Sequence, residues 1–169
     1  MTTFNPKTHH RRSIRLKGYD YSQARLYFIT ICTQNQECLF GDISHGEMVL
    51  NDVGIMVKNE WLKLKNRYQN LDLHEYIVMP NHFHGIIQIV ANGQKIRTPT
   101  VGDMIGAFKS LVTNKYIRNV KHNNWQRFNG KLWQRNYYEH IVRDEKSFLQ
   151  IAQYIETNPL KWQDDKYHI

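Results

Sequence analysis

A chain of 169 residues is long enough for one domain with a buried core, and 41% hydrophobic against 22% charged residues is typical of a globular protein. The chain holds no apolar run near the ~18 residues of a membrane span and no signal-peptide pattern, so we expect a cytoplasmic protein without a membrane partner. Cys32 and Cys38 are the only cysteines, which excludes a disulfide framework. The net charge of +8 favours a polyanion such as nucleic acid as the partner.

Residues 1–20 form a basic segment with neither helical nor strand periodicity, so we predict a surface arm. In one interpretation the arm contacts nucleic-acid phosphates, and in the other it is a solvated tail. The candidate phosphate contacts are Arg11, Arg12, Arg15 and Lys17.

A strand, a hairpin and a helix are predicted in that order after the arm. Residues 25–33 are β-branched and aromatic with no breaker, which is typical of a central strand. A short hairpin follows, with strands at 40–43 and 47–50 around a Ser-His-Gly turn. Asn51 then caps a helix over 52–67, where apolar residues recur at helical spacing.

Two strands and a second helix come next. Residues 73–79 and 84–90 are rich in strand formers and are joined by a Pro-Asn turn. Thr98 or Thr100 caps a helix over about 101–120, which carries a continuous apolar stripe.

The final part of the chain contains one more strand and one more helix. The strand is predicted over 132–142, where aromatic residues alternate along the sequence. Asp144 caps the helix, which reaches Asn158 and is stopped by Pro159, and residues 163–169 form a short tail. This order indicates a single α+β domain spanning the chain, with helices on one face of a mainly antiparallel sheet, as in ferredoxin-like or RNA-recognition-like (RRM-like) folds.

Residues 118–135 mix cations with aromatic rings and include no acidic residue. Single-stranded nucleic acid is bound by this mixture, because cations hold phosphates and flat rings stack on unpaired bases. The candidate binding residues are Lys121, Trp125, Arg127, Lys131, Trp133 and Arg135.

His82 and His84 lie where a predicted strand begins, in the sequence Met-Pro-Asn-His-Phe-His-Gly. Successive side chains of a strand point to opposite faces, so both imidazoles project from one face and Phe83 from the other. Two neutral imidazoles in register are candidate ligands for one cation, provided that a third, oxygen-bearing group approaches. A structural pair that caps the strand is the alternative, and the pattern leaves both open.

Tyr154 and Asn158 are spaced i and i+4 and therefore share one face of the last predicted helix. Asn158 offers a neutral oxygen to a hard cation, and Tyr154 offers a hydroxyl beside it. Opposite His82 and His84 they would complete a His-His-Asn site for Mg²⁺ or Mn²⁺. In the alternative interpretation Tyr154 is half-buried with a satisfied hydroxyl and Asn158 is a helix C-cap.

Four segments, taken together and in order, carry a resemblance to a known family. They are Tyr27 to Thr33 (YFITICT), Met79 to Gly85 (MPNHFHG), Leu132 to Ile141 (LWQRNYYEHI) and Tyr154 to Pro159 (YIETNP). The chain resembles the single-tyrosine HUH transposases, and most closely the REP-associated tyrosine transposases. The resemblance spans about residues 11–162, nearly the whole chain.

The resemblance implies an HUH endonuclease fold and a role for each motif residue. His82 and His84 are then metal ligands, Asn158 is the third ligand, and Tyr154 is the nucleophile, with Mg²⁺ or Mn²⁺ as cofactor. The implied reaction is attack of Tyr154 on a single-stranded DNA hairpin, which gives a 5′-phosphotyrosine and a free 3′-hydroxyl. It also implies a location at the nucleoid and either a monomer or a homodimer that exchanges the tyrosine helix.

Other nucleophiles and other functions stay open at this stage. Tyr137 and Tyr138 are rival nucleophiles, but they fall on a predicted strand and not on the ligand-bearing helix. A non-catalytic single-strand-binding module is one alternative function, and a nicking enzyme like a replication initiator or relaxase is another. The His-His-Tyr-Asn set argues against the first, and the compact length argues against the second.

Overall fold

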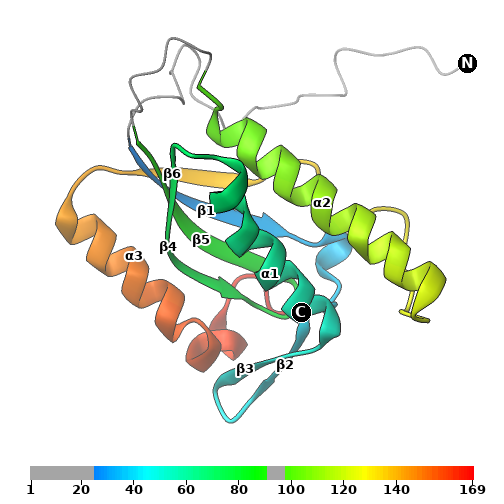
Figure 1. Ribbon diagram of the computed structural model, residues 1–169. Helices are drawn as coiled ribbons and strands as arrows, with labels where there is room; N and C mark the ends of the chain where they lie inside the picture. Colours follow the sequence, from blue (N-terminus) through cyan, green and yellow to red (C-terminus); the bar gives the residue numbers. More distant parts are fainter. Residues whose placement is uncertain (1–24, 91–97) are drawn as a thin grey trace, which may run out of the picture.

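The computed structural model describes residues 25–90 and 98–169, so the predicted arm contacts Arg11, Arg12, Arg15 and Lys17 lie outside the described residues. The described chain is built around one four-stranded antiparallel sheet in the order β4-β5-β1-β6 (Figure 1). Its strands are β1 (Leu26–Cys32), β4 (Leu71–Val78), β5 (His82–Ile89) and β6 (Tyr138–Val142).

A separate hairpin and the helices complete the described part. The hairpin pairs β2 (Gly41–Ser44) with β3 (Glu47–Leu50). The helices are α1 (Asp52–Arg67), α2 (Val101–His122) and α3 (Glu145–Thr157), with the 3-10 helices η1 (Gln34–Gln36) and η2 (Pro159–Asp164). Within residues 25–90 and 98–169, no helix is both long and apolar enough to cross a membrane.

The helix starts follow the predicted capping residues. Asn51 accepts a hydrogen bond from the backbone N–H of Gly54 at the start of α1. Thr100, and not Thr98, caps α2 through a reciprocal capping box with Asp103. The cap of α3 is Asp144, as expected.

Successive side chains of β1 point to opposite faces of the sheet, so the interior of the protein has two layers. Tyr27, Ile29 and Ile31 are fully buried in the larger core beneath α1 and α2. Phe28 points to the other face and joins a smaller apolar cluster, and Thr30 lies on that same second face. The site described below belongs to this second face.

The larger core is organised by three aromatic rings from different elements. Trp61 of α1 lies with its ring centroid 4.4 Å from that of Phe83 on β5 and 5.3 Å from that of Phe108 on α2. Because Phe83 is anchored in this cluster, its two neighbours along β5 are held with their side chains on the opposite face.

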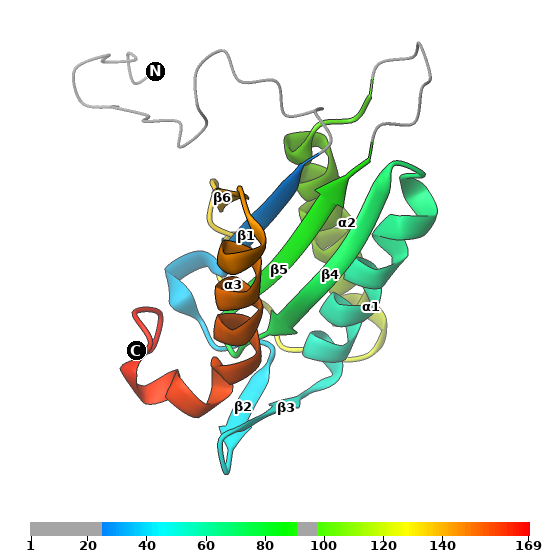
Figure 2. The ribbon, with the colours of Figure 1, turned by 90° about the vertical axis from the view of Figure 1, so that its left-hand side faces the viewer.

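Helix α3 covers the face of the sheet opposite to α1 and α2 (Figure 2). The α+β class and the antiparallel sheet are confirmed, but the helices do not all share one face as expected. The reason is visible on β5, where Ile86 and Ile87 are adjacent and both fully buried. A central strand that is apolar on both faces needs a cover on each, and Ile155 of α3 packs with Ile86 on the second face.

The last strand is shorter than the predicted 132–142. Trp133 still reaches the sheet through an isolated bridge with Thr33, but regular pairing starts only at Tyr138. Between these points the side-chain ammonium of Lys109 binds the carbonyls of Gln134 and Arg135, at 2.6 and 3.1 Å. The backbone N–H of Gln134 still donates to the carbonyl of Cys32 at 2.9 Å, so the chain stays beside β1 there without forming regular strand pairs.

Gly85 is placed where a side chain would collide with the aromatic core. A Cβ built on Gly85 would lie 2.7 Å from Trp61 Cζ2 and 2.9 Å from Phe83 Cε1. We expect Gly85→Ala to lower the free energy of unfolding by about 1–3 kcal/mol, the usual cost of overpacking a core. Urea unfolding would measure the change, and Gly106→Ala is the control because no atom lies within 4 Å of its added Cβ. Equal stability of the two variants would contradict the close contact.

Candidate active site

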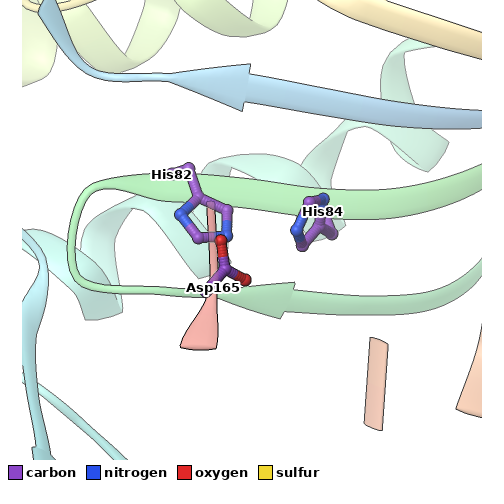
Figure 3. A group of neighbouring side chains, drawn as sticks. All are labelled: His82, His84 and Asp165. Atoms are coloured by element: carbon purple, nitrogen blue, oxygen red, sulfur yellow. The ribbon is translucent and has the colours of Figure 1, made fainter. Parts of the chain in front are cut away.

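His82 and His84 project from the same face of β5, as the strand alternation predicted. Both side chains are buried, at 0% and 1% exposure, and their ring centroids lie 4.6 Å apart. They pair across the sheet with Cys32 and Thr30 of β1, so the site lies at the end of β1 where β5 begins. Figure 3 shows the two rings on the same side of the strand.

Each imidazole is oriented by a hydrogen bond at its Nδ1 atom. His82 Nδ1 lies 2.8 Å from Asn81 Oδ1, and His84 Nδ1 lies 2.8 Å from Thr30 Oγ1. The amide orientation of Asn81 is defined, since its Nδ2 donates to the carbonyls of Gln36 and Tyr167. His82 therefore carries its proton on Nδ1 and keeps a lone pair on Nε2, the arrangement found in metal-ligating histidines.

Tyr154 and Asn158 approach the histidine pair from α3, one helical turn apart. The Tyr154 hydroxyl lies 3.4 Å from His84 Nε2, and the residue is 38% exposed. Asn158 is only 2% exposed, and its Nδ2 donates to Asp165 Oδ2 at 2.9 Å. The predicted set of four residues is thus brought together in space.

Two buried polar atoms of this set have no partner with hydrogen-bond geometry. They are His82 Nε2 and Asn158 Oδ1. A lone pair on each of them points into the protein, although an unpaired buried acceptor costs about 1–3 kcal/mol. A nitrogen and an amide oxygen left in this way are the donors that a bound cation would use.

Asp165 also belongs to the site and was not predicted. It follows η2, and its carboxylate forms a group with the ring nitrogens of His82 and His84 in which all ligand atoms lie within 4.8 Å of one another (Figure 3). The same tail brings Tyr167 against His82, with ring centroids 4.6 Å apart. No spacing in the sequence relates position 165 to position 82, so pattern analysis had no signal for this contact.

The burial of the site controls the charge of its residues. Burial lowers the pKa of His82 to about 4, although the nearby Asp165 carboxylate and Asn158 amide act in the opposite direction. Burial, with the positive charges of His82 and Lys166, lowers the pKa of His84 as well. Both imidazoles are therefore neutral at pH 7 and able to act as ligands.

We expect the metal-free protein to lose stability as the pH falls below about 6.5, the pKa of histidine in an unfolded chain. Above that pH His82 is neutral in both states and has no effect. Between about 6.5 and about 4 only the unfolded state gains the proton, which costs roughly 3 kcal/mol at the lower limit. His84 contributes with the same sign.

Urea unfolding in EDTA at pH 7.5, 6 and 5 measures this pH dependence. The matched control is His82→Asn, whose free energy of unfolding should fall less steeply with pH. Parallel curves for the two proteins would show that His82 is not buried in its neutral form.

The phenol of Tyr154 is a weak acid in the metal-free protein. Burial, together with the carboxylate of Asp165 and the phenol of Tyr167, raises the pKa of Tyr154 to about 12. A phenolate at this position needs a positive charge nearby.

Only some of the predicted nucleic-acid-binding residues in the basic stretch 118–135 are accessible to a ligand. The four predicted contacts among its cations, Lys121, Arg127, Lys131 and Arg135, are exposed and form no salt bridge within the described part of the chain. Trp125 is half-buried, with its ring edge against Tyr116. Trp133 corrects the prediction, because it is 5% exposed and packs between Phe40 and Phe108 in the larger core. Its ring cannot stack on a base.

The fold and the site together define a class of protein. The antiparallel sheet presents two histidines to Tyr154 of α3 and to Asn158 at the C-cap of that helix, and the fold is shared with a solved REP-associated tyrosine transposase. The chain belongs to the family described as "Transposase IS200 like", which matches residues 46–158. Membership assigns a transposase role with DNA as the partner, and it implies a divalent metal.

Two relatives come from Haemophilus influenzae. An uncharacterised protein is 42% identical over 99% of this chain and 98% of its own length. A protein provisionally named a REP-associated tyrosine transposase is 23% identical over 84% of this chain and 74% of its own length. The first relative shares essentially the full length of the chain.

Two solved structures share the fold. One is a REP-associated tyrosine transposase bound to a REP hairpin, with a TM-score of 0.62, 18% identity, and coverage of 90% of this chain and 76% of that one. The other is a provisionally assigned transposase from Deinococcus radiodurans, with a TM-score of 0.51, 21% identity, and coverage of 84% and 95%.

Proposed function

We propose that this transposase cleaves and rejoins single-stranded DNA hairpins through a covalent 5′-phosphotyrosine at Tyr154. The observation that carries the proposal is the Tyr154 hydroxyl, partly exposed and 3.4 Å from His84 Nε2, beside the unpartnered Nε2 of His82 and Oδ1 of Asn158. A nucleophile next to two such candidate ligand atoms is the arrangement that metal-assisted phosphoryl transfer requires.

The donor set fits a divalent ion. His82, His84 and Asn158 would hold it, and the Asp165 carboxylate is close enough to the two histidines to add negative charge. When bound, the ion would neutralise a non-bridging oxygen of the phosphodiester and polarise its phosphorus. Two imidazoles and one or two oxygens suit Mn²⁺ better than Mg²⁺, which prefers oxygen ligands throughout. We expect both ions to support the reaction, with Mn²⁺ effective at lower concentration.

The proposed step balances in atoms and charge. The Tyr154 oxygen forms a bond to phosphorus while the bond from phosphorus to the 3′ oxygen of the preceding nucleotide breaks. The tyrosine loses its proton and the leaving 3′ oxygen gains one, so charge and atoms balance. The phosphotyrosine keeps the energy of the broken bond, so the 3′-hydroxyl of another strand can reverse the step without ATP.

The exposed cations at the end of α2 and in the segment that follows it supply a surface for the DNA backbone. Two of them border a hollow of about 270 Å³, which is lined by Ile117, Val120, Lys121, Arg127 and Phe128. An aromatic ring beside two cations is suited to an unpaired nucleotide. Since the substrate is DNA, we propose that the protein acts in the cytoplasm at the nucleoid.

The test of the proposed function uses hairpin oligonucleotides from the DNA flanking the gene, labelled at either end and incubated with the protein in Mn²⁺, Mg²⁺ or EDTA. On a denaturing gel, a 3′ label should migrate with the protein and a 5′ label should appear on a shorter free strand. Both products should require metal. Binding without any adduct in either metal would favour the non-catalytic binding module instead.

A further inference from the structure

Tyr138 lies in the same cross-strand row as the catalytic site. It pairs with Thr30 of β1, and Thr30 pairs on its other side with His84 of β5. Residues paired in this way project from the same face of a sheet. Tyr138 is therefore on the face of His84, but on the edge strand, where it is 42% exposed.

A lysine of the C-terminal tail lies over this tyrosine. Lys166 Nζ is 5.7 Å from the ring centroid of Tyr138 and 4.8 Å from that of Tyr167. Lys166 is exposed, and its ammonium forms no salt bridge to a carboxylate of residues 25–90 or 98–169. The ammonium donates a hydrogen bond to the Tyr167 hydroxyl, which raises the pKa of Lys166, so the side chain keeps its positive charge.

The residues on both sides of Lys166 are held by residues of the site. Asn158 Nδ2 holds the carboxylate of Asp165 at 2.9 Å, and Asn81 Nδ2 holds the carbonyl of Tyr167 at 2.7 Å. An exposed lysine between two anchored neighbours loses less conformational freedom on binding than a lysine on a free tail.

Tyr138 and Tyr154 flank one ring and have different roles. The centroid of Phe28 lies 6.4 Å from that of Tyr138 and 6.1 Å from that of Tyr154. Only Tyr154 contacts a candidate ligand, through His84 Nε2. Tyr138 and Tyr154 are therefore near neighbours on one face of the sheet, and a strand bound at Tyr154 lies within reach of Tyr138.

We infer that Lys166 and Tyr138 form a subsite for the DNA backbone phosphate next to the scissile one. The ammonium binds the phosphate, and the rings of Tyr138 and Tyr167 together hold the ammonium in place. This inference rests on the proposed function for its substrate, single-stranded DNA.

The test measures how strongly binding depends on salt. All proteins carry Tyr154→Phe to prevent cleavage, and the probe is a single-stranded hairpin oligonucleotide that wild type binds. Loss of one phosphate contact should weaken binding several-fold at low salt. It should also reduce the slope of log Kd against log salt by about 0.7, the value for one phosphate of a single strand. We expect both effects for Lys166→Gln and neither for Lys65→Gln, an exposed lysine on α1 that pairs with Asp72.

A double-variant cycle tests whether Tyr138 positions the ammonium of Lys166. Tyr138→Leu should weaken binding in the wild-type lysine background and have little further effect once Lys166 is replaced. Tyr138→Phe, which keeps the ring, should bind like its parent. A Lys166→Gln slope equal to that of Lys65→Gln would overturn the subsite.

The inference and the proposed function fail in distinguishable ways. An adduct formed by wild type together with an unchanged Lys166→Gln slope would reject the subsite alone. Binding without an adduct, together with a reduced slope, would reject the cleavage reaction and leave the phosphate contact in place.

Discussion

Tyr154→Phe is expected to reduce formation of the covalent protein–DNA adduct by about three orders of magnitude or more, because the only atom removed is the attacking oxygen. The fold should be unaffected. The lost hydroxyl is partly exposed and only 3.4 Å from His84 Nε2, a long contact, so the change in the free energy of unfolding should stay below about 1 kcal/mol. Quantitative denaturing gels on a 3′-labelled hairpin, with urea unfolding of the same preparation, measure both quantities.

The matched control is Tyr138→Phe, which removes the same atom from the neighbouring tyrosine. Tyr138 is also exposed and also lies beside Phe28, but no contact joins it to either histidine. We expect its adduct yield to equal that of wild type. An adduct that persists in Tyr154→Phe and disappears in Tyr138→Phe would transfer the nucleophile to β6.

The elements of the fold were predictable because their signals are local. Asn51 and Asp144 cap helices through bonds to residues three positions away, so the sequence alone determines where those helices begin. The same is true of the histidine pair, since the alternation of a strand fixes which face His82 and His84 share. Contacts that span a few residues are visible in sequence spacing.

The side of the sheet covered by α3 was not predictable in this way. The apolar stripe of α3 shows that one face of this helix is buried, but it does not show which face of the sheet the helix packs against. Trp133 was misassigned for a related reason, because an aromatic residue among cations has the same composition in a binding loop and in a core. Only the packing of Trp133 between Phe40 and Phe108 distinguishes the two.

The site depends both on local contacts, which the sequence spacing predicts, and on contacts that only the tertiary fold creates. Tyr154 and Asn158 share a helical face by spacing, but that this face meets β5 depends on the tertiary fold. No sequence pattern predicts the contact of Asp165 with the histidines, because it depends on the path of the chain after η2. The structure consequently offers two candidate oxygen ligands, Asn158 and Asp165, where the sequence indicated Asn158 alone.

Asn158→Ala is expected to weaken Mn²⁺ binding more than Asp165→Ala. The asparagine is buried, its Oδ1 has no partner, and its Nδ2 holds Asp165, so its removal deletes one donor and releases the other. Removal of Asp165 deletes one carboxylate and leaves Oδ1 of Asn158 in place. Since loss of a supporting contact alone typically costs about 10–100-fold in metal affinity, we expect at least about 100-fold for Asn158→Ala and roughly tenfold for Asp165→Ala.

Titration of Mn²⁺ by calorimetry measures these affinities without depending on cleavage, and His82→Ala serves as the reference for a lost ligand. Thermal unfolding of the same variants with and without Mn²⁺ gives a second readout, because an ion that binds only the folded state stabilises it in proportion to its affinity. Near-wild-type affinity in Asn158→Ala with a large loss in Asp165→Ala would make the tail carboxylate the third ligand. The helix would then supply only the nucleophile, and the divalent site would depend on the C-terminal tail lying where it does.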